Sequence, residues 1–220
     1  MRGVFVAGAH TDVGKTFAAC ALIRGARERG LKVAALKPVV SGFDPDDWTQ
    51  SDPGRLLQAL GQPLSMANLD ALSPRRFRAP LSPPMAARLE GVRLDLAELV
   101  GFCRAGLAAT DADLTVVEGV GGLMSPVAED GTGLDLILAL GLPIVLVGGT
   151  YLGAISHTLT AIEVLRGRGV AITAVVVSQS GEADAPDFAQ SVAGVAAFAG
   201  DVRVLAAARH DATSWPGAIL

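Results

Sequence analysis

The stretch Gly8-Ala9-His10-Thr11-Asp12-Val13-Gly14-Lys15-Thr16 decides the fold of this 220-residue chain. It follows an apolar run at residues 4–7, which predicts a buried strand, and it opens residues 15–29, which predict a helix closed by Gly30. A glycine-rich loop that joins a strand to a helix and ends in Lys-Thr is typical of a phosphate-binding P-loop. The backbone N–H groups of such a loop, and of the helix start behind it, point at phosphate oxygens.

Individual positions of this loop predict contacts with a nucleotide. The Lys15 ammonium would neutralise charge on the β- and γ-phosphates, and the Thr16 hydroxyl would bind Mg²⁺. The other positions expected to contact the nucleotide are Asp12, Val13, Gly14 and Phe17. Five residues separate the two glycines, one more than the strict P-loop pattern has. A glycine-rich turn that contains Lys-Thr by chance therefore stays open as an alternative.

Further apolar runs extend this strand–helix unit. Residues 32–38, 114–117, 143–147 and 171–177 lack in-and-out alternation, which suits strands covered on both faces of a parallel sheet. Residues 95–109 and 156–168 predict amphipathic helices, and Asp95 with Glu98 resembles a capping box at the start of the first. The predicted fold class is α/β, with a doubly wound, mostly parallel sheet of the P-loop nucleoside triphosphate hydrolase fold, in one domain over residues 1–220.

Two segments stand apart from this pattern. Residues 41–94 hold more than half of the 12 prolines and show little periodicity. We interpret them as an insertion between strands, which in α/β proteins often carries the site. The pattern also weakens after Gly200, so residues 201–220 are interpreted as a weakly matched C-terminal segment, with the last ten residues as a tail.

Charged residues at predicted strand ends are candidates for chemistry. Lysine is rare, with three lysines against 15 arginines, so a compact ammonium is favoured at Lys15 and Lys37. Lys37 ends a predicted strand at the carboxyl edge of the sheet, where sites lie, although a surface lysine stays open as an alternative. Glu118 ends another strand before a glycine-rich turn and would hold Mg²⁺, as in Walker B strands, or else cap a helix. Asp52 is weaker, because a lone loop aspartate usually forms a turn.

Composition excludes several classes of protein. Hydrophobic residues make up 50% of the chain and charged residues 18%, so a full core is expected and wholesale disorder is not. The net charge of −4 argues against a general nucleic-acid binder. Cys20 and Cys103 are interpreted as core thiols of a reducing compartment. The uncharged residues 136–155 reach membrane-span length, but Pro143 and nearby glycines predict a helix end, a turn and a buried strand instead. The apolar run at the N-terminus is too short for a signal peptide.

Other polar clusters gave weaker indications. Arg75, Arg76 and Arg78 are expected on a solvated loop face, with an anion site as the alternative. The three histidines have no mutual spacing that suggests a metal site or a catalytic triad, and no dinucleotide fingerprint is visible.

Taken together, five motifs resemble the dethiobiotin synthetases in order and spacing. They are Gly8-x-x-Thr11-x-Val13-Gly14-Lys15-Thr16, Lys37-Pro38-Val39-x-Ser41-Gly42, Ser51-Asp52, Ala79-Pro80-x-Ser82-Pro83 and Val117-Glu118-Gly119-x-Gly121-Gly122. The later Gly153-x-x-Ser156-His157 is similar to the family's Gly-x-x-Asn-His segment. The resemblance covers roughly residues 3–180, and the combination is far more specific than the P-loop alone.

The resemblance implies a ligase of biotin biosynthesis that closes the ureido ring of dethiobiotin, driven by ATP with Mg²⁺. One amine of 7,8-diaminopelargonate takes up CO₂ to give a carbamate, whose oxygen attacks the γ-phosphate to form a carbamic–phosphoric anhydride. The second amine then attacks the carbonyl carbon and expels phosphate. The implied partners are diaminopelargonate, CO₂ or bicarbonate, a nucleoside triphosphate, and a second copy of the chain in a homodimer with sites at the interface. The implied location is the cytoplasm.

The resemblance also implies roles for single residues. The catalytic contacts would come from Lys15, Lys37, Thr11 and Ser41, and the Mg²⁺ sphere from Thr16, Asp52 and Glu118, with Glu118 also touching the nucleotide. The other substrate-binding residues implied are Pro80, Gly119, Tyr151, Leu152, Gly153 and Ser156, of which the last four would belong to the second subunit. Two departures matter. Ser178 and Gln179 stand where the family often recognises adenine with an Asn, which leaves base preference open, and Ser156 replaces a usual Asn.

Other P-loop proteins of similar fold remain the alternative. A partitioning ATPase normally has a second lysine early in its loop, where this chain has His10. Cobyrinate- and cobyrate-type amidotransferases append a glutaminase domain with a nucleophilic cysteine, whereas Cys103 falls in a predicted helix core. A partitioning-type nucleotide switch or an amidotransferase-like ligase is therefore the second interpretation.

Overall fold

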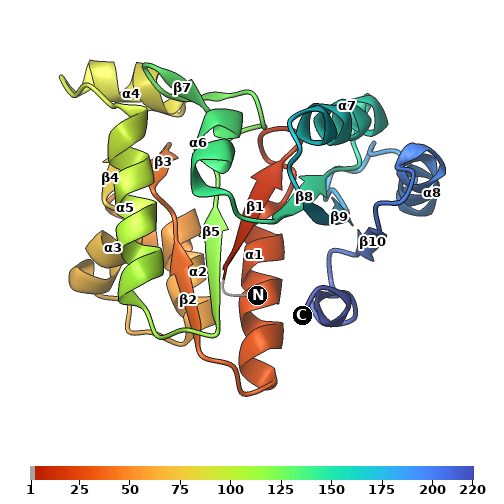
Figure 1. Cartoon of the computed structure of the whole chain (residues 1–220), viewed down its shortest axis with the longest axis horizontal. Helices are drawn as coiled ribbons and strands as arrows, with labels where there is room; N and C mark the ends of the chain where they lie inside the picture. The colour runs from red at the N-terminus through yellow and green to blue at the C-terminus, as the bar shows by residue number, and fades with distance from the viewer. Residues whose placement is uncertain (1–2) are drawn as a thin grey trace.

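A six-stranded sheet organises the computed structural model, which describes residues 3–220. Its strand order is β10-β9-β8-β1-β5-β2, and every neighbouring pair is parallel. The strands are β1 (Gly3–Gly8), β2 (Val33–Leu36), β5 (Leu114–Glu118), β8 (Ile144–Gly148), β9 (Ile172–Ser178) and β10 (Val204–Ala207). In Figure 1 the chain begins with β1 inside the sheet and reaches the blue edge strand β10 late. The predicted α/β class with a parallel sheet is confirmed.

Helices cover both faces of this sheet. One face carries α1 (Lys15–Glu28), α2 (Asp52–Leu60) and α3 (Met66–Leu72); the other carries α4 (Pro83–Leu89), α5 (Leu96–Ala109), α6 (Gly133–Leu140), α7 (Ala154–Gly167) and α8 (Phe188–Phe198). Alternate residues of one strand therefore enter different cores. Val4 and Val6 pack on the α1 side, whereas Phe5 and Ala7 pack on the α7 side. Burial on both sides explains why the strands are continuous apolar runs in the sequence.

The position of β1 determines where a ligand can bind. It lies between β5 and β8. The chain leaves it through α1, on one face, to reach β2, whereas α7 and α8, on the other face, lead from β8 to β9 and β10. A crevice opens outside the carboxyl ends of the strands at such a change of direction. Gly8, Leu36, Glu118, Gly148 and Ser178 end their strands at this edge.

The proline-rich residues 41–94 contain more regular structure than their sequence indicates. They hold the 3₁₀ turn η1 (Trp48–Gln50), the helices α2, α3 and α4, and the strand β4 (Arg75–Phe77), which pairs in parallel with β3 (Val39–Ser41). The solvated loop expected at Arg75 and Arg76 is thus largely a strand, and these two side chains pair with Glu98 and Asp70. The helices are too short for periodicity to reveal them. A small antiparallel hairpin joins β6 (Pro126–Ala128) to β7 (Gly131–Thr132).

Two helix starts differ from the prediction. Asp95 precedes α5 but makes no side-chain cap, because its carboxylate pairs with Arg93 while Glu98 pairs with Arg75. The capping box lies instead at α6, between Thr132 and Asp135. Helix α7 begins at Ala154 rather than at residue 156. It follows Gly153 directly, whose φ of 94° lies in the left-handed region that favours glycine.

The C-terminal residues are ordered, so the predicted tail is wrong. Strand β10 pairs with β9, and the 3₁₀ turn η2 (Pro216–Ala218) packs on α1. Trp215 is only 3% exposed and joins the core on the α1 side. A Cβ on Gly25 of α1 would lie 3.1 Å from Cβ of Pro216, so the glycine admits the turn. The strand β10 is four residues long and half-buried, which leaves little pattern in the sequence.

The cysteines and the longest apolar stretch fit the composition analysis. Cys20 and Cys103 are buried and unbridged, and burial raises the pKa of each thiol to about 12. The uncharged residues 136–155 form the end of α6, a turn, β8 and the start of α7. Within residues 3–220, none of the helices combines the length and apolarity that crossing a membrane requires.

Candidate active site

The P-loop has the tight backbone that phosphate binding requires. Asp12 has a φ of 56° and Gly14 a φ of 90°, both in the left-handed region. A Cβ on Gly8 would lie 2.7 Å from the carbonyl oxygen of His10, and one on Gly14 would lie 2.5 Å from Oγ of Ser178. Side chains at the two glycines would therefore open the loop. The extra residue relative to the strict pattern is accommodated without losing the turn into α1.

Lys15 is the first residue of α1 and points back over the loop. Its Nζ donates to the carbonyl oxygen of His10 at 3.2 Å, and its side chain is buried. Burial and the positive charge of Lys37 together lower the pKa of Lys15 to about 8. The positive charge of this buried ammonium is not fully balanced by nearby carboxylates, so it favours an incoming anion.

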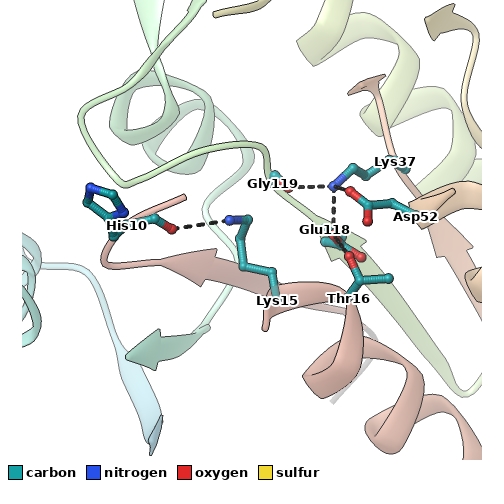
Figure 2. A network of polar contacts seen from close by, with 7 residues as sticks. All are labelled: His10, Lys15, Thr16, Lys37, Asp52, Glu118 and Gly119. Atoms are coloured by element: carbon teal, nitrogen blue, oxygen red, sulfur yellow. Dashed lines mark hydrogen bonds and ion pairs between the residues drawn. The ribbon is translucent and has the colours of Figure 1, made fainter. Parts of the chain in front are cut away.

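A second lysine binds two carboxylates at the strand ends. Lys37 Nζ lies 2.6 Å from Oε1 of Glu118 and 3.0 Å from Oδ2 of Asp52, and it donates to the carbonyl oxygen of Gly119 at 2.9 Å. The Thr16 hydroxyl donates to the same Oε1 of Glu118 at 2.7 Å. Figure 2 shows these side chains converging beside Lys15. They come from α1, the end of β2, the start of α2 and the end of β5.

The charges of this cluster depend on one another. Burial alone would lower the pKa of Lys37, but Asp52 and Glu118 outweigh it and raise that pKa. Burial would likewise raise the pKa of Asp52, but Lys37 holds it at about 2. Glu118 is fully enclosed, so burial raises its pKa, while Lys37 opposes the rise. Asp52 has 40% of its side chain exposed, so solvent weakens its share of the pairing.

The same oxygens suit a divalent cation. Oε2 of Glu118 is buried and has no hydrogen-bond partner. Carboxylate and hydroxyl oxygens are ligands that Mg²⁺ prefers, and Thr16, Asp52 and Glu118 supply them. A cavity of about 220 Å³ lies against Thr16, Asp52, Lys15 and Gly14. The described chain has no cluster of three or more His, Cys, Asp and Glu side chains, so a metal here would also need oxygens from a ligand.

A larger pocket extends from the P-loop across the ends of β8, β9 and β10. It has a volume of about 430 Å³. Its lining consists of Asp12, Val13, Gly14, Phe17, Gly149, Thr150, Tyr151, Ser178, Gln179, Ser180, Gly181, Glu182 and Arg209. The backbone N–H of Ser180 donates to the buried Thr150 hydroxyl at 2.7 Å, which fixes the loop after β9. Sequence reasoning placed Ser178 and Gln179 here but missed Arg209, because the motif resemblance fades before it.

Other expected substrate contacts lie around this centre. Gly119 accepts from Lys37 through its carbonyl oxygen, and Thr11 lines a separate cavity of about 350 Å³ with Ser125. Ser41 ends β3, and Pro80 packs near Gly42, where a Cβ would lie 3.5 Å from Cβ of Pro80. Among residues 3–220, no hydrogen bond joins the side chain of Thr11 or of Ser41 to Lys37.

The start of α7 forms a different surface. Leu152, Gly153 and Ser156 are exposed, and Leu152 is 94% exposed. Tyr151 borders the larger pocket, and its hydroxyl lies 2.8 Å from Nδ1 of His157. The rings of His10 and His157 stack with centroids 5.5 Å apart. Sequence spacing gave no sign of this contact, because His10 lies in the loop after β1, whereas His157 lies in the first turn of α7.

Comparisons with known proteins agree with this geometry. The family described as AAA domain matches residues 2–211. The ATP-dependent dethiobiotin synthetase BioD of Phenylobacterium zucineum (strain HLK1) is 57% identical over 219 residues, covering 100% of this chain and 94% of the relative. The BioD protein of Caulobacter vibrioides (strain NA1000 / CB15N) is 53% identical over 209 residues, covering 95% and 93%.

Among solved structures, the similarity concerns the fold alone. The MinC:MinD cell division protein complex of Aquifex aeolicus gives a TM-score of 0.54 at 11% identity, covering 93% of this chain and 79% of that chain. The ParA family ATPase of Chlorobium tepidum TLS gives 0.53 at 12% identity, covering 96% and 85%. These neighbours place the chain among P-loop folds without favouring a partitioning role, whereas the identities above decide the family. The chain belongs to the dethiobiotin synthetase family.

Proposed function

We propose that this protein is an ATP-dependent ligase that closes the ureido ring of dethiobiotin from 7,8-diaminopelargonate and CO₂. The observation that carries the proposal is the buried Lys37, held between Asp52 and Glu118 beside the P-loop lysine. A nucleotide-binding loop alone would serve a switch protein equally well. A second buried cation next to it suits a reaction in which a new anion, the carbamate, meets the γ-phosphate.

The two lysines would act by position and charge. Phosphoryl transfer needs neutralisation of oxygen charge and alignment of the attacking group more than a covalent nucleophile. Lys15 would bridge the transferring phosphoryl group and the carbamate, and Lys37 would hold the carbamate oxygens. Because Lys37 is pinned by contacts of 2.6 to 3.0 Å, its charge is already in place before substrate arrives. Such preorganisation favours the transition state.

Thr16, Asp52 and Glu118 would hold Mg²⁺ together with phosphate oxygens of ATP. Bound there, the metal would supply positive charge to the β- and γ-phosphate oxygens. Lys37 now contacts both carboxylates, so these three residues also set how strongly the lysine is held. The nucleotide itself would lie in the larger pocket, with its phosphates on Asp12, Val13, Gly14, Lys15 and Thr16, and with Phe17, Ser178 and Gln179 toward the base.

The organic substrate would lie along Thr11, Ser41, Pro80 and Gly119, with its amines near Lys37. We further propose a homodimer in which the Tyr151 to Ser156 turn of the second copy receives the far carboxylate. Free backbone N–H groups at the start of α7 suit an anion. The 220 residues would act as one domain in which residues 41–94 carry the metal and substrate loop, since Asp52 and Ser41 both lie there. The two free, buried thiols support a cytoplasmic location.

The reaction can be tested with purified protein, diaminopelargonate, bicarbonate, Mg²⁺ and ATP. We expect mass spectrometry to find the cyclic urea only when all components are present, with one phosphate released per ring closed. Omission of the diamine, of bicarbonate or of Mg²⁺ provides the controls. Nucleotide hydrolysis without cyclic urea would contradict the proposal and favour the alternative P-loop ATPase.

The shared site can be tested by mixing inactive variants. Lys37→Ala removes the cation of one half of the proposed site, and Gly153→Trp blocks the turn that the second copy would contribute. Neither variant should be active alone, but heterodimers formed after mixing should contain one intact site and regain activity. If mixing restores nothing although the chains exchange, each site belongs to one chain.

A further inference from the structure

Arg209 lies in the nucleotide pocket on the side away from the two lysines. It follows β10, the edge strand, which is three strands from β1 in the order of the sheet. It lines the same cavity as Ser178, Gln179 and Glu182. With the triphosphate on the P-loop, this part of the cavity is left for the base. The inference that follows rests on the proposed function for that placement of the nucleotide.

Two hydrogen bonds to Gln179, the residue directly after β9, hold the backbone at Arg209 in place. The backbone N–H of Gln179 donates to the carbonyl oxygen of Ala207, and the backbone N–H of Arg209 donates to Oε1 of Gln179, each at 3.0 Å. The loop carrying Arg209 is thus tied to the loop after β9. The Gln179 oxygen accepts this bond, so its amide N–H groups remain free as donors for a ligand, beside the second lone pair of the oxygen.

The guanidinium occupies space that a glycine leaves free. A Cβ at Gly181 would lie 1.3 Å from Nη1 of Arg209, which is too close for two non-bonded atoms. Any other residue at position 181 would therefore displace the guanidinium. Gly181 and Arg209 form a matched pair in the wall of the pocket, and both line it.

The chemistry of this wall separates the four common bases into two groups. A guanidinium donates and never accepts hydrogen bonds, and it can also stack on a base. Guanine, cytosine and uracil each carry a carbonyl oxygen that can accept from it, whereas adenine has no carbonyl oxygen and can accept only through its ring nitrogens. We propose that Arg209 is a specificity-determining residue that donates to a base carbonyl and so extends nucleotide use from ATP to GTP, CTP and UTP.

The acidic groups of the same pocket do not oppose this assignment. Asp12 belongs to the P-loop, near the phosphates, and Glu182 has its backbone N–H tied to Ser180 Oγ at 3.2 Å. A carboxylate at position 182 can accept from the amino groups of guanine, cytosine or adenine alike. Arg209 is therefore the charged group of the lining that distinguishes carbonyl-bearing bases from adenine.

The test measures kcat and KM of wild-type protein and of variants with ATP, GTP, CTP and UTP. Arg209→Ala should raise KM about fivefold for GTP, CTP and UTP and less than about twofold for ATP, with kcat unchanged, as expected for a partly exposed bond from a charged donor. Gly181→Ala should shift the four KM values in the same direction, because it displaces the guanidinium. Arg209→Lys should fall between. His210→Ala, an exposed neighbour outside the pocket, is the matched control.

Equal changes of KM for all four nucleotides in Arg209→Ala would overturn the inference, and so would unchanged KM values. A Gly181→Ala variant with the KM values of the wild type would also overturn it. Equilibrium titration of the same proteins with ADP, GDP, CDP and UDP measures base preference without turnover. If base preference follows Arg209 while no dethiobiotin forms, the proposed function fails and this inference stands. If dethiobiotin forms but base preference does not depend on Arg209, this inference fails and the proposed function stands.

Discussion

The two ends of the nucleotide site are held by different means. At the phosphate end, Lys15, Lys37 and Glu118 are buried, and contacts of 2.6 to 3.0 Å join Lys37 to Glu118, Gly119 and Asp52. At the base end, Gln179 and Arg209 are exposed and are tied mainly through backbone N–H groups. Buried charges leave one arrangement, because an unpaired one is costly. Exposed donors can adjust, so the difference teaches that the proposed phosphate end is held in one arrangement, whereas the proposed base end can adapt.

The largest effect should come from removing the buried cation of the phosphate end. We expect Lys37→Ala to reduce kcat about 10²- to 10³-fold, the range for loss of one preorganised charge partner. Nucleotide affinity should persist, because the P-loop is untouched. Turnover assays and calorimetry with ADP measure the two quantities, and thermal melts report any cost of leaving Glu118 unpaired. Lys32→Ala, at an exposed lysine paired with Asp111, is the control. Lost nucleotide affinity with normal turnover at saturation would contradict this role.

The next largest effect should come from the carboxylate that Lys37 shares with Thr16. Glu118→Gln keeps the shape of the side chain but removes its charge, so the requirement for Mg²⁺ should rise by about 10- to 100-fold. Titration of activity against Mg²⁺ concentration measures this shift. The control is Glu163→Gln, at an exposed glutamate of α7. An unchanged Mg²⁺ dependence would show that Glu118 serves Lys37 alone.

A smaller effect concerns pH. Lys15 has a pKa of about 8 in the ligand-free protein, lowered by burial, so it loses its proton as pH rises through that value. Nucleotide affinity should then fall with rising pH, by up to about tenfold per unit. Lysine in the unfolded chain has a pKa of about 10.4. Between the folded and unfolded pKa values the unfolded state therefore binds more protons, and the contribution of Lys15 to the free energy of unfolding rises with pH.

Calorimetry with ADP from pH 7 to pH 9.5 measures the first of these effects. Lys15→Arg is the comparison, because arginine stays charged throughout this range. Its affinity should be lower than that of the wild type at neutral pH but nearly flat above pH 8. A parallel decline in both proteins would assign the pH dependence to another group.

The smallest effect should come from the base end. Ser178 is 8% exposed and lies against Gly14, so a larger side chain there must project into the pocket. We expect Ser178→Asn to raise kcat/KM for ATP relative to kcat/KM for GTP about threefold, which is the change expected from one modest hydrogen bond. The four-nucleotide assay measures it. If the order of the four nucleotides and their ratios stay as in wild type, position 178 does not read the base.

The residues of the proposed phosphate end could be brought together from the sequence because their signals are local. A loop motif, and strands that end in Lys37 and Glu118, predict residues on one edge of a parallel sheet, and the structure brings Nζ and Oε1 of these two within 2.6 Å. Asp52 was the weakest of these residues by pattern. It joins them because it begins α2, a helix too short to be seen in the proline-rich segment.

The base end could not be predicted in the same way. Arg209 reaches the pocket through β10, whose four half-buried residues carry no clear pattern, and its fit depends on Gly181 in another loop. The contact of His10 with His157 likewise joins residues far apart in the chain. The sequence indicated a capping box at Asp95, whereas the structure has one at Thr132. Asp95 and Glu98 pair instead with Arg93 and Arg75, and sequence spacing does not show these pairs.

The two tryptophans of the chain stand in separate environments. Trp48 lies in η1, where its carbonyl oxygen accepts from the Ser51 hydroxyl just before Asp52. Trp215 is sealed against α1, and its indole N–H has no partner in the described chain. Indole emission shifts to longer wavelength as water gains access. The molecule therefore carries two intrinsic optical probes, one that reports changes around the start of α2 and one whose emission changes only when the core opens.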